Sequence, residues 1–256
     1  MSHTLRSRFA SWTRWRRQRD DARADRAGET HDDTRWIARF DTPTDEERER
    51  WSRRARNVHG RPLFSLLMPV RDPYPQRLAR AIASVQAQAY DRWELCIADD
   101  HSADPHVKRV LSDFAFADPR IRVVWRMQRT QPSTMFNAAL DIARGEHVAL
   151  LSPDDALSEH ALLCIAETIA RKPRAAIVYS DEDCIDDDGQ RRTPWCKPDW
   201  NRELFRGSGG LSHLGVFRTE LVRRVGGFRS GFDGAEEFDL ALRCVDATHE
   251  LRAEHA

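Results

Sequence analysis

Hydrophobic and polar positions follow two different periods along the middle of the chain. Short apolar runs are typical of buried strands, and they predict strands over residues 64–70, 94–98, 121–125, 147–151 and 176–180. Apolar residues at helical spacing between these runs predict helices over residues 76–89, 105–116, 133–144 and 156–172. Gly145 is expected to end the third helix. Because strands that alternate with helices form parallel pairs, the pattern predicts an α/β fold with a Rossmann-like, mostly parallel sheet and helices on both faces.

The chain before the first strand divides into two regions. Residues 33–60 contain two short helical patterns, one over 34–40 and one that begins after the N-cap candidate Thr44, and then a linker. Residues 1–32 are rich in arginine and predict a flexible tail. We therefore expect three parts: the tail, the helical lead-in with its linker, and one domain over residues 61–256.

The chain after the fifth strand is less regular. Residues 184–212 predict loops, with a turn at 186–189 and a flexible glycine-rich stretch at 207–210. The last predicted elements are a strand over 214–218 and helices over 221–225 and 235–245.

Composition narrows the class of protein. The 256 residues include 41 Lys+Arg and 41 Asp+Glu, so the net charge favours no nucleic-acid partner. The five cysteines are scattered without a Cys-x-x-Cys pair, which indicates reduced thiols in a cytoplasmic setting and no zinc site. No apolar run reaches the roughly 18 residues of a membrane span, and the N-terminus lacks a signal-peptide core. We therefore expect a cytoplasmic protein.

The arginine-rich start of the chain is a candidate membrane contact. Residues 1–30 hold eight Arg and four acidic residues, and Leu5, Phe9 and Trp12 share one face of a helix. Such a helix can lie on an anionic surface, so residues 1–20 predict peripheral contact with the inner face of the membrane. The alternative is a solvated tail.

Three groups of acidic residues follow predicted strands. Asp99 and Asp100 follow the second strand, Asp154 and Asp155 the fourth, and residues 181–183 the fifth. Because ligands bind outside the carboxyl ends of the strands in an open parallel sheet, these acids are expected to converge at the ligand edge. They suit a cation and a polar, hydroxyl-rich ligand, and they would repel a bare phosphate unless a metal intervenes.

Each acidic group also has a structural interpretation. The first pair precedes a helix and would cap it, and Ser152 to Asp155 has the composition of an ordinary helix start. Residues 181–183 fit a solvated loop, and Glu236 with Glu237 would favour the dipole of the helix that they begin. Both interpretations stay open for each group.

Two tryptophans, Trp195 and Trp200, lie in the irregular region around Lys197. Aromatic faces stack well on sugar rings, but a tryptophan in a loop can instead cover the core.

Several ordered blocks of the chain resemble family-2 glycosyltransferases with the GT-A fold. The blocks cover residues 64–70, 81–90, 93–100, 179–183, 197–201, 213–216 and 226–229. The later blocks are similar to the bacterial surface-polysaccharide branch, and residues 35–42 look like its helical lead-in. The resemblance extends over residues 33–250, and so many blocks in one order make it specific for fold and family.

The resemblance implies an enzyme that transfers a sugar from a nucleotide-diphosphate donor to a glycan or lipid-linked acceptor, with inversion. It implies a nucleotide site made by Pro69, Val70, Asp72, Asp100, Asn137 and Asp154. Asp154 and Asp155 would hold a divalent cation, Mn²⁺ or Mg²⁺, on the diphosphate. Glu237 would be the general base that takes the proton of the acceptor hydroxyl. We expect the acceptor to lie against Asp181, Glu182, Asp183 and Trp200.

Four features depart from the family pattern. Ser152 stands where the metal motif usually has its first acid, and Glu237 stands where the base is usually Asp. A misplacement of about 1 Å can cost on the order of 10²-fold in rate. The donor loop over residues 129–137 is stiffer and bulkier than the usual loop with Gly and Ser. The family's His-any-Trp segment, whose His often completes the metal site, does not follow before Ala256.

These departures leave two functional classes open. The first is a metal-dependent glycosyltransferase that builds a surface glycan, favoured by Asp100, Asp154 and Asp155. The second is a catalytically weak or inactive GT-A domain that binds a nucleotide or a partner protein, favoured by Ser152 and Glu237. A nucleotidyltransferase would also bind a nucleotide and metals on an α/β sheet, but no Gly-rich phosphate loop follows the first strand.

Overall fold

The computed structural model describes residues 37, 42–208, 213–248 and 253–256. The predicted tail with its membrane contact lies outside these residues, and so does the predicted helix over 34–40 apart from Ile37. The helices of the structure are α3 (Asp45–Arg56), α4 (Pro75–Gln86), α5 (Pro105–Ala117), α6 (Pro132–Asp141), α7 (Ala161–Arg171), α8 (Arg202–Ser208), α9 (Thr219–Arg224) and α10 (Glu236–Asp246). Its strands are β1 (Phe64–Val70), β2 (Trp93–Asp99), β3 (Ile121–Trp125), β4 (His147–Leu150), β5 (Ile177–Tyr179), β6 (Glu182–Ile185), β7 (Arg191–Trp195), β8 (Gly215–Arg218) and β9 (Ala253–His255).

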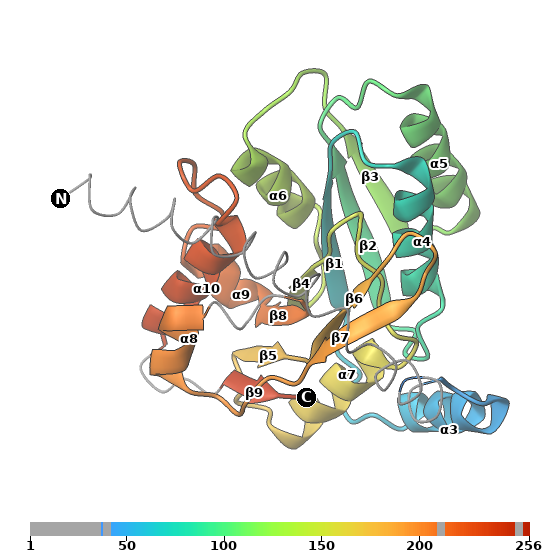
Figure 1. Ribbon diagram of the computed structural model, residues 1–256. Coiled ribbons are helices and arrows are strands. Elements are labelled where there is room, and N and C mark those ends of the chain that lie inside the picture. The colour runs from blue at the N-terminus through green and yellow to red at the C-terminus, as the bar shows by residue number, and fades with distance from the viewer. Residues whose placement is uncertain (1–36, 38–41, 209–212, 249–252) are drawn as a thin grey trace.

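Seven strands form one sheet in the order β3-β2-β1-β4-β8-β5-β9 (Figure 1). β1 to β4 pair in parallel, and so do β5 and β9. β8 lies antiparallel between β4 and β5. The predicted, mostly parallel sheet is therefore confirmed.

Side chains of the sheet enter two core layers. On β1, Leu66 and Met68 join one layer and Leu67 joins the other, because successive side chains of a strand point to opposite faces. Buried side chains of α4, α5 and α7 complete the first layer, and those of α6, α9 and α10 complete the second. The helices thus cover both faces, as expected.

The lead-in helix α3 begins as its sequence predicts. The Thr44 hydroxyl accepts a hydrogen bond from the Glu47 N–H (3.3 Å), and the Glu47 carboxylate accepts one from the Thr44 N–H (2.9 Å). This reciprocal cap satisfies two backbone donors that the first helical turn leaves unpaired.

The prediction of a helix from residue 156 is wrong, because α7 begins at Ala161. The preceding backbone bonds to α4 instead: the Leu157 N–H donates to Ser84 Oγ (3.0 Å), and Gln88 Nε2 donates to the Ser158 carbonyl (2.7 Å). The segment after β4 therefore forms an isolated turn, and its interpretation as a helix start is also wrong.

The prediction of loops over residues 184–212 is wrong in two places. β6 and β7 form an antiparallel hairpin, and α8 follows it. The predicted turn at 186–189 is confirmed as the hairpin connection, with Gly189 at φ +79°. Pro194 and the two arginines of β7 concealed its alternating strand pattern. Residues 207–208 of the predicted flexible stretch lie in α8, and 209–210 lie outside the described residues.

Gly145 does not end α6, which stops at Asp141. A Cβ at Gly145 would lie 2.6 Å from the Leu63 carbonyl oxygen and 2.7 Å from Ser65 Oγ, so the glycine allows the chain to pass close to β1. β9 was also not predicted, and it extends the sheet beside β5. The five cysteines all lie in the described ranges, and none of them is in a disulfide. Within the described ranges, no helix has the length and hydropathy to cross a bilayer.

Candidate functional site

The loops after β1, β2 and β3 carry a group that we call the Asp100 cluster, formed by Arg71, Asp72, Asp100, Arg129 and Thr130. Asp100 is fully buried. Its carboxylate accepts hydrogen bonds from the Thr130 N–H (3.0 Å) and hydroxyl (2.7 Å), and from Arg71 Nε (2.9 Å) and Nη2 (2.6 Å). Burial acts to raise the pKa of Asp100, but these donors lower it below its usual value. Asp100 is therefore an ionised carboxylate that is already bonded within the protein.

Asp72 joins the turn after β1 to two other loops. It has φ +46°, a left-handed conformation that aspartate adopts more readily than most residues. Its carboxylate accepts the Ala103 N–H (2.7 Å) and pairs with Arg129, and its own N–H donates to Ser102 Oγ (3.1 Å). The predicted nucleotide site is thus a bonded framework before any ligand arrives.

The other predicted nucleotide residues are structural in this framework. Pro69 and Val70 end β1, the first half-buried and the second buried. Asn137 on α6 uses its whole amide on the backbone of Phe228: Nδ2 donates to the carbonyl (2.8 Å) and Oδ1 accepts from the N–H (2.9 Å). Asn137 therefore ties α6 to the segment ahead of α10, and its role toward a donor stays a prediction.

The turn after β4 presents the two predicted metal ligands. Asp155 Oδ2 accepts the Ser152 N–H (3.1 Å) and lies 3.3 Å from Nδ1 of His213. Asp154 is half exposed, and its Oδ1 lies 3.5 Å from Nη1 of Arg77. The Ser152 hydroxyl accepts the Asp154 N–H (3.3 Å), so serine at this position shapes the turn.

His213 was not among the predicted site residues, yet three carboxylates act on it. Because β8 is antiparallel to β4, the residues just ahead of it lie at the carboxyl edge of the sheet. Burial acts to lower the pKa of His213, but its bond to Asp155 and the charges of Asp155, Glu237 and Glu182 raise it to about 9. His213 is therefore a cation at neutral pH.

Lys197 is the second site residue that the sequence did not indicate. Its side chain is 1% exposed, and its Nζ donates to the His213 carbonyl (2.7 Å) and lies 3.3 Å from Glu182 Oε2. We call Asp155, Glu182, Lys197, His213 and Glu237 the His213 cluster. Lys197 and His213 each stand first in a block that resembles the family, and this was the signal that could have found them.

The other predicted acceptor residues have partners around the hairpin. Asp181 Oδ1 accepts the Lys197 N–H (2.6 Å) and lies 2.8 Å from Nε2 of His255. Asp183 Oδ2 accepts a hydrogen bond from Arg191 Nε (2.7 Å). Glu182 is the member of this acidic group that reaches the His213 cluster.

Trp200 is partly buried and packs on the second core layer. Its ring centre lies 5.4 Å from that of Phe205. This packing agrees with the interpretation of Trp200 as a cover for the core, and an acceptor contact stays a prediction.

The start of α10 directs one of its acids to the site. Glu237 is half-buried, and its charge acts on His213. Glu236 is 7% exposed, burial raises its pKa, and its Oε1 has no hydrogen-bond partner among the described residues. Asp239 pairs with Arg243 one turn later (2.7 Å), which fixes the helix.

Asp154 and Asp155 fit a divalent cation in their chemistry. They supply carboxylate oxygens, which Mg²⁺ and Mn²⁺ prefer, and the Asp154 carboxylate is half exposed. The part of the chain that the structure describes holds no group of three His, Cys, Asp or Glu side chains placed around a metal position. A cation at this pair would take its other ligands from water and from donor phosphates, as Mg²⁺ commonly does.

Comparison with known proteins identifies a family that the chain matches and relatives that are similar in sequence. Residues 65–226 match the family described as "Glycosyl transferase family 2". An uncharacterized protein of Sinorhizobium fredii is 46% identical over 206 residues, which are 80% of this chain and 23% of that protein. The O-antigen biosynthesis protein RfbC of Myxococcus xanthus is 39% identical over 191 residues, 75% of this chain and 15% of that protein. The chain thus spans less than a quarter of these two relatives.

Solved structures share the fold. The crystal structure of S. aureus TarS 1-349 in complex with UDP matches with a TM-score of 0.63 at 18% identity, over 76% of this chain and 57% of that one. The mannosyltransferase PcManGT from Pyrobaculum calidifontis, in complex with GDP-Man and Mn²⁺, matches with a TM-score of 0.56 at 18% identity, over 82% of this chain and 62% of that one. At these identities the likeness concerns the fold.

Proposed function

The chain belongs to glycosyl transferase family 2, and we propose that its GT-A domain transfers a sugar from a nucleotide-diphosphate donor to a hydroxyl of a surface glycan or lipid-linked acceptor. The family, fold and enzyme class were predicted correctly. The observation that carries the proposed reaction is the position of Asp155 at the ligand edge of the sheet, 3.3 Å from Nδ1 of His213, where the charges of Glu182 and Glu237 also act on His213. The name of RfbC, an O-antigen biosynthesis protein, supports a surface glycan as the product.

The Asp100 cluster is the proposed binding site of the nucleotide. The residues proposed to line it are Pro69, Val70, Asp72, Asp100 and Asn137, with Asp154 beside the diphosphate. A carboxylate accepts a hydrogen bond from an imide N–H, so Asp100 favours a uracil or thymine base. Because Arg71 and Thr130 already use the acceptor positions of Asp100, the base would take the place of one of these donors.

A divalent cation, Mn²⁺ or Mg²⁺, is proposed at Asp154 and Asp155. When bound, it would neutralise charge that grows on the leaving diphosphate. The Mn²⁺ complex of PcManGT supports this assignment. Within the chain, the Ser152 N–H orients Asp155, and Arg77 brings a second positive charge to Asp154.

Glu237 is the proposed general base. It would take the proton of the acceptor hydroxyl while that oxygen attacks the anomeric carbon opposite the leaving diphosphate, which inverts the centre. The positive charges of His213 and Lys197 offset the mutual repulsion of the carboxylates around them. Further acceptor contacts are proposed for Asp181, Glu182, Asp183 and Trp200.

A second candidate is a catalytically weak or inactive domain that binds a nucleotide or a partner protein. Ser152 favours it, because this serine replaces the first acid of the family's metal motif. The turn after β4 is left with two adjacent carboxylates, those of Asp154 and Asp155. The amide of Asn137 favours it as well, since the backbone of Phe228 occupies both of its polar atoms.

Thermal unfolding of the chain with UDP, dTDP, GDP and their sugars, with and without Mn²⁺, separates these candidates. A donor at 100 times its dissociation constant stabilises the fold by about 2.7 kcal/mol. We expect one nucleotide to do so only with Mn²⁺, and Asp155→Ala to remove the Mn²⁺-dependent part. If no donor stabilises the wild-type chain, the inactive-domain candidate replaces the first proposal.

We also propose a cytoplasmic location with peripheral membrane contact through residues 1–20. Five cysteines without a disulfide support a reducing compartment. The membrane contact rests on the arginine-rich sequence of that segment.

A further inference from the structure

His255 of β9 contacts two side chains at the end of β5, on the ligand edge of the sheet. β9 pairs with β5 in parallel and places His255 opposite Tyr179. The His255 ring stacks on that of Tyr179 (ring centres 5.2 Å apart), and its Nε2 lies 2.8 Å from Asp181 Oδ1. Because a carboxylate oxygen only accepts hydrogen bonds, Nε2 is the donor. This pair belongs to neither the proposed nucleotide site nor the proposed metal ligands.

Both side chains that His255 contacts also hold the segment that follows β7. Asp181 Oδ1 accepts the Lys197 N–H (2.6 Å), and the Tyr179 hydroxyl donates to the Pro198 carbonyl (2.7 Å). The backbone position of Lys197 therefore depends on two side chains, and His255 restrains both of them.

The Lys197 side chain extends from this segment into the His213 cluster. It is 1% exposed, and its Nζ donates to the His213 carbonyl (2.7 Å) and lies 3.3 Å from Glu182 Oε2. A buried cation is stable only while its partners stay in place, because an unpaired charge at this depth is costly. A shift of the Lys197 backbone would withdraw Nζ from both partners, and one of them is the residue that lies beside Asp155.

We propose that His255 is a positioning residue for the reaction proposed above. Through Asp181 it fixes the backbone of Lys197, and so it holds the Lys197 ammonium between Glu182 and the His213 carbonyl. His255 itself touches neither the donor nor the acceptor. The effect on rate rests on the proposed function, whereas the placement of Lys197 can be measured in a chain without turnover.

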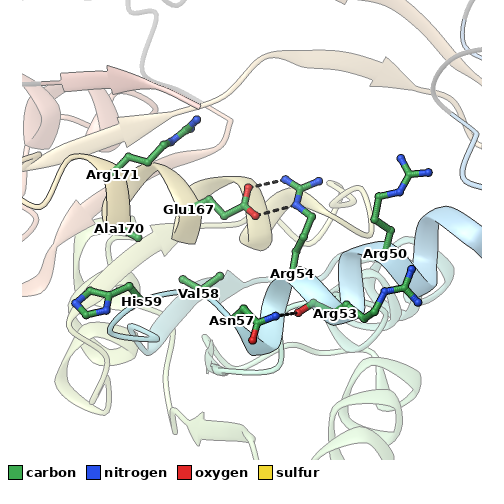
Figure 2. Close-up of a pocket in the computed structure, with 9 residues that line it drawn as sticks. All are labelled: Arg50, Arg53, Arg54, Asn57, Val58, His59, Glu167, Ala170 and Arg171. Carbon is green, nitrogen blue, oxygen red and sulfur yellow. Dashed lines mark hydrogen bonds and ion pairs between the residues drawn. The ribbon is translucent and has the colours of Figure 1, made fainter.

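β9 has a second side-chain contact, which leads away from the site. Glu254 Oε2 lies 3.2 Å from Nζ of Lys172, the residue after α7. α7 in turn is docked on α3 by the forked pair of Arg54 with Glu167 (2.8 and 2.5 Å), which Figure 2 shows in the wall of the pocket between these helices. Glu254 therefore anchors β9 without reaching the His213 cluster, which makes it a control within the same strand.

The first arm of the test measures how fast acetic anhydride labels Lys197. The chain has three lysines, and Lys108 and Lys172 are exposed, so Lys108 gives an internal reference rate. In the wild type, Lys197 should be labelled much more slowly than Lys108, through local opening of its segment. His255→Asn carries its amide where Nδ1 stands and falls short of Asp181. It should speed the labelling of Lys197 about ten-fold relative to Lys108, the effect of losing one hydrogen bond to a charged group.

Matched variants separate the hydrogen bond from the rest of β9. His255→Gln carries its amide nitrogen where Nε2 stands and should restore slow labelling, and Glu254→Gln should leave the labelling slow. If His255→Asn lowers the unfolding temperature, His255→Phe replaces it, because it keeps a ring on Tyr179 without the donor. The placement of Lys197 by His255 is overturned if a folded variant without the donor labels Lys197 at the wild-type rate.

The second arm measures the release of UDP from UDP-GlcNAc with Mn²⁺. His255→Asn should lower kcat several-fold and leave KM for the donor near wild type, because the Asp100 cluster keeps its contacts, and His255→Gln should recover the rate. Fast labelling of Lys197 with an unchanged kcat would overturn the role of His255 in the reaction. If the wild type releases no UDP, that result counts against the proposed function alone, and the labelling arm still decides the placement of Lys197.

Discussion

The two edges of the sheet hold histidines in opposite charge states. At the amino edge, His147 lies beside Phe64 (ring centres 5.9 Å apart), and neither of its ring nitrogens has a partner in the described structure. Burial, with a smaller effect of Arg218, lowers the pKa of His147 to about 4. At the carboxyl edge, burial also opposes a charge on His213, but Asp155 and two further carboxylates raise its pKa to about 9.

His147 is the more deeply buried of the two, but burial lowers the pKa of both, so the opposite direction of the two pKa shifts comes from the neighbours. The amino edge surrounds His147 with apolar side chains and backbone, so a charge there would destabilise the fold. Several carboxylates lie at the carboxyl edge. Their mutual repulsion opposes folding unless a ligand, a metal or another cation offsets it. Substitutions at the carboxyl edge should therefore change function first, and those at the amino edge should change stability.

The sharpest test of this contrast is Glu237→Gln. As the proposed base it should lower turnover by about 10²- to 10⁴-fold, while donor affinity and the unfolding temperature stay near wild type. Initial rates with the donor found by thermal unfolding measure this. Glu220→Gln, an exposed change on α9, is the control. Turnover equal to wild type in Glu237→Gln would remove the residue from the base role.

The second prediction concerns acid stability through His147. Its folded pKa of about 4 lies below the unfolded value of about 6.5, so between these pH values the unfolded chain binds the proton. Stability should fall as pH falls through this window, by about 3 kcal/mol. Urea midpoints from pH 7 to pH 4 measure it, and His147→Leu should flatten the slope. An equal slope in that variant would show that other groups cause the acid loss.

The third prediction concerns a substitution at Asp100, which tests whether folding stability depends on a charged group at the carboxyl edge. Asp100→Asn keeps the shape but leaves the Arg71 guanidinium without its anion. We expect a loss of about 2 kcal/mol, less than for a fully buried pair because Arg71 is 34% exposed. Chemical denaturation measures it. A stability equal to wild type would show that the fold does not require the Asp100 carboxylate.

The smallest expected effect is an alkaline loss of stability through His213, measured in EDTA. Its raised pKa means that the folded chain keeps a proton that the unfolded chain has lost. The contribution is fully present below pH 6.5 and is lost as pH rises towards 9, on the order of 1 kcal/mol after allowance for solvent screening. His213→Gln should be flat over this range, and a slope like that of the wild type would assign the loss to another group.

Much of the sheet could be predicted because its central strands are buried on both faces. β1 has the predicted bounds, since a strand packed on two layers leaves a continuous apolar run. The start of α7 could not be predicted. Ser84 and Gln88, far away in sequence, take the backbone bonds that would have continued the helix.

For the site, the sequence predicted Asp155 as a metal ligand and Glu237 as the base. The charges of both act on His213, and their roles stay predictions. Lys197 and His213 were missed because their places depend on the hairpin and on the antiparallel direction of β8, which are contacts between distant segments. The sequence around Lys197 gives no sign that its side chain will be buried against Glu182.

The clamp between Asn137 and the backbone of Phe228 has an evolutionary consequence. The adjacent Gly227 has φ +65°, and a Cβ there would lie 2.6 Å from Asn137 Oδ1. Neither position can be substituted alone. A side chain at 227 would displace the Asn137 amide, and a different side chain at 137 would leave the Phe228 backbone without its hydrogen bonds. Chimaeras that take α6 from one relative and α10 from another should fold only when both parents carry this Asn and Gly, so the pair marks a seam at which lineages cannot be freely recombined.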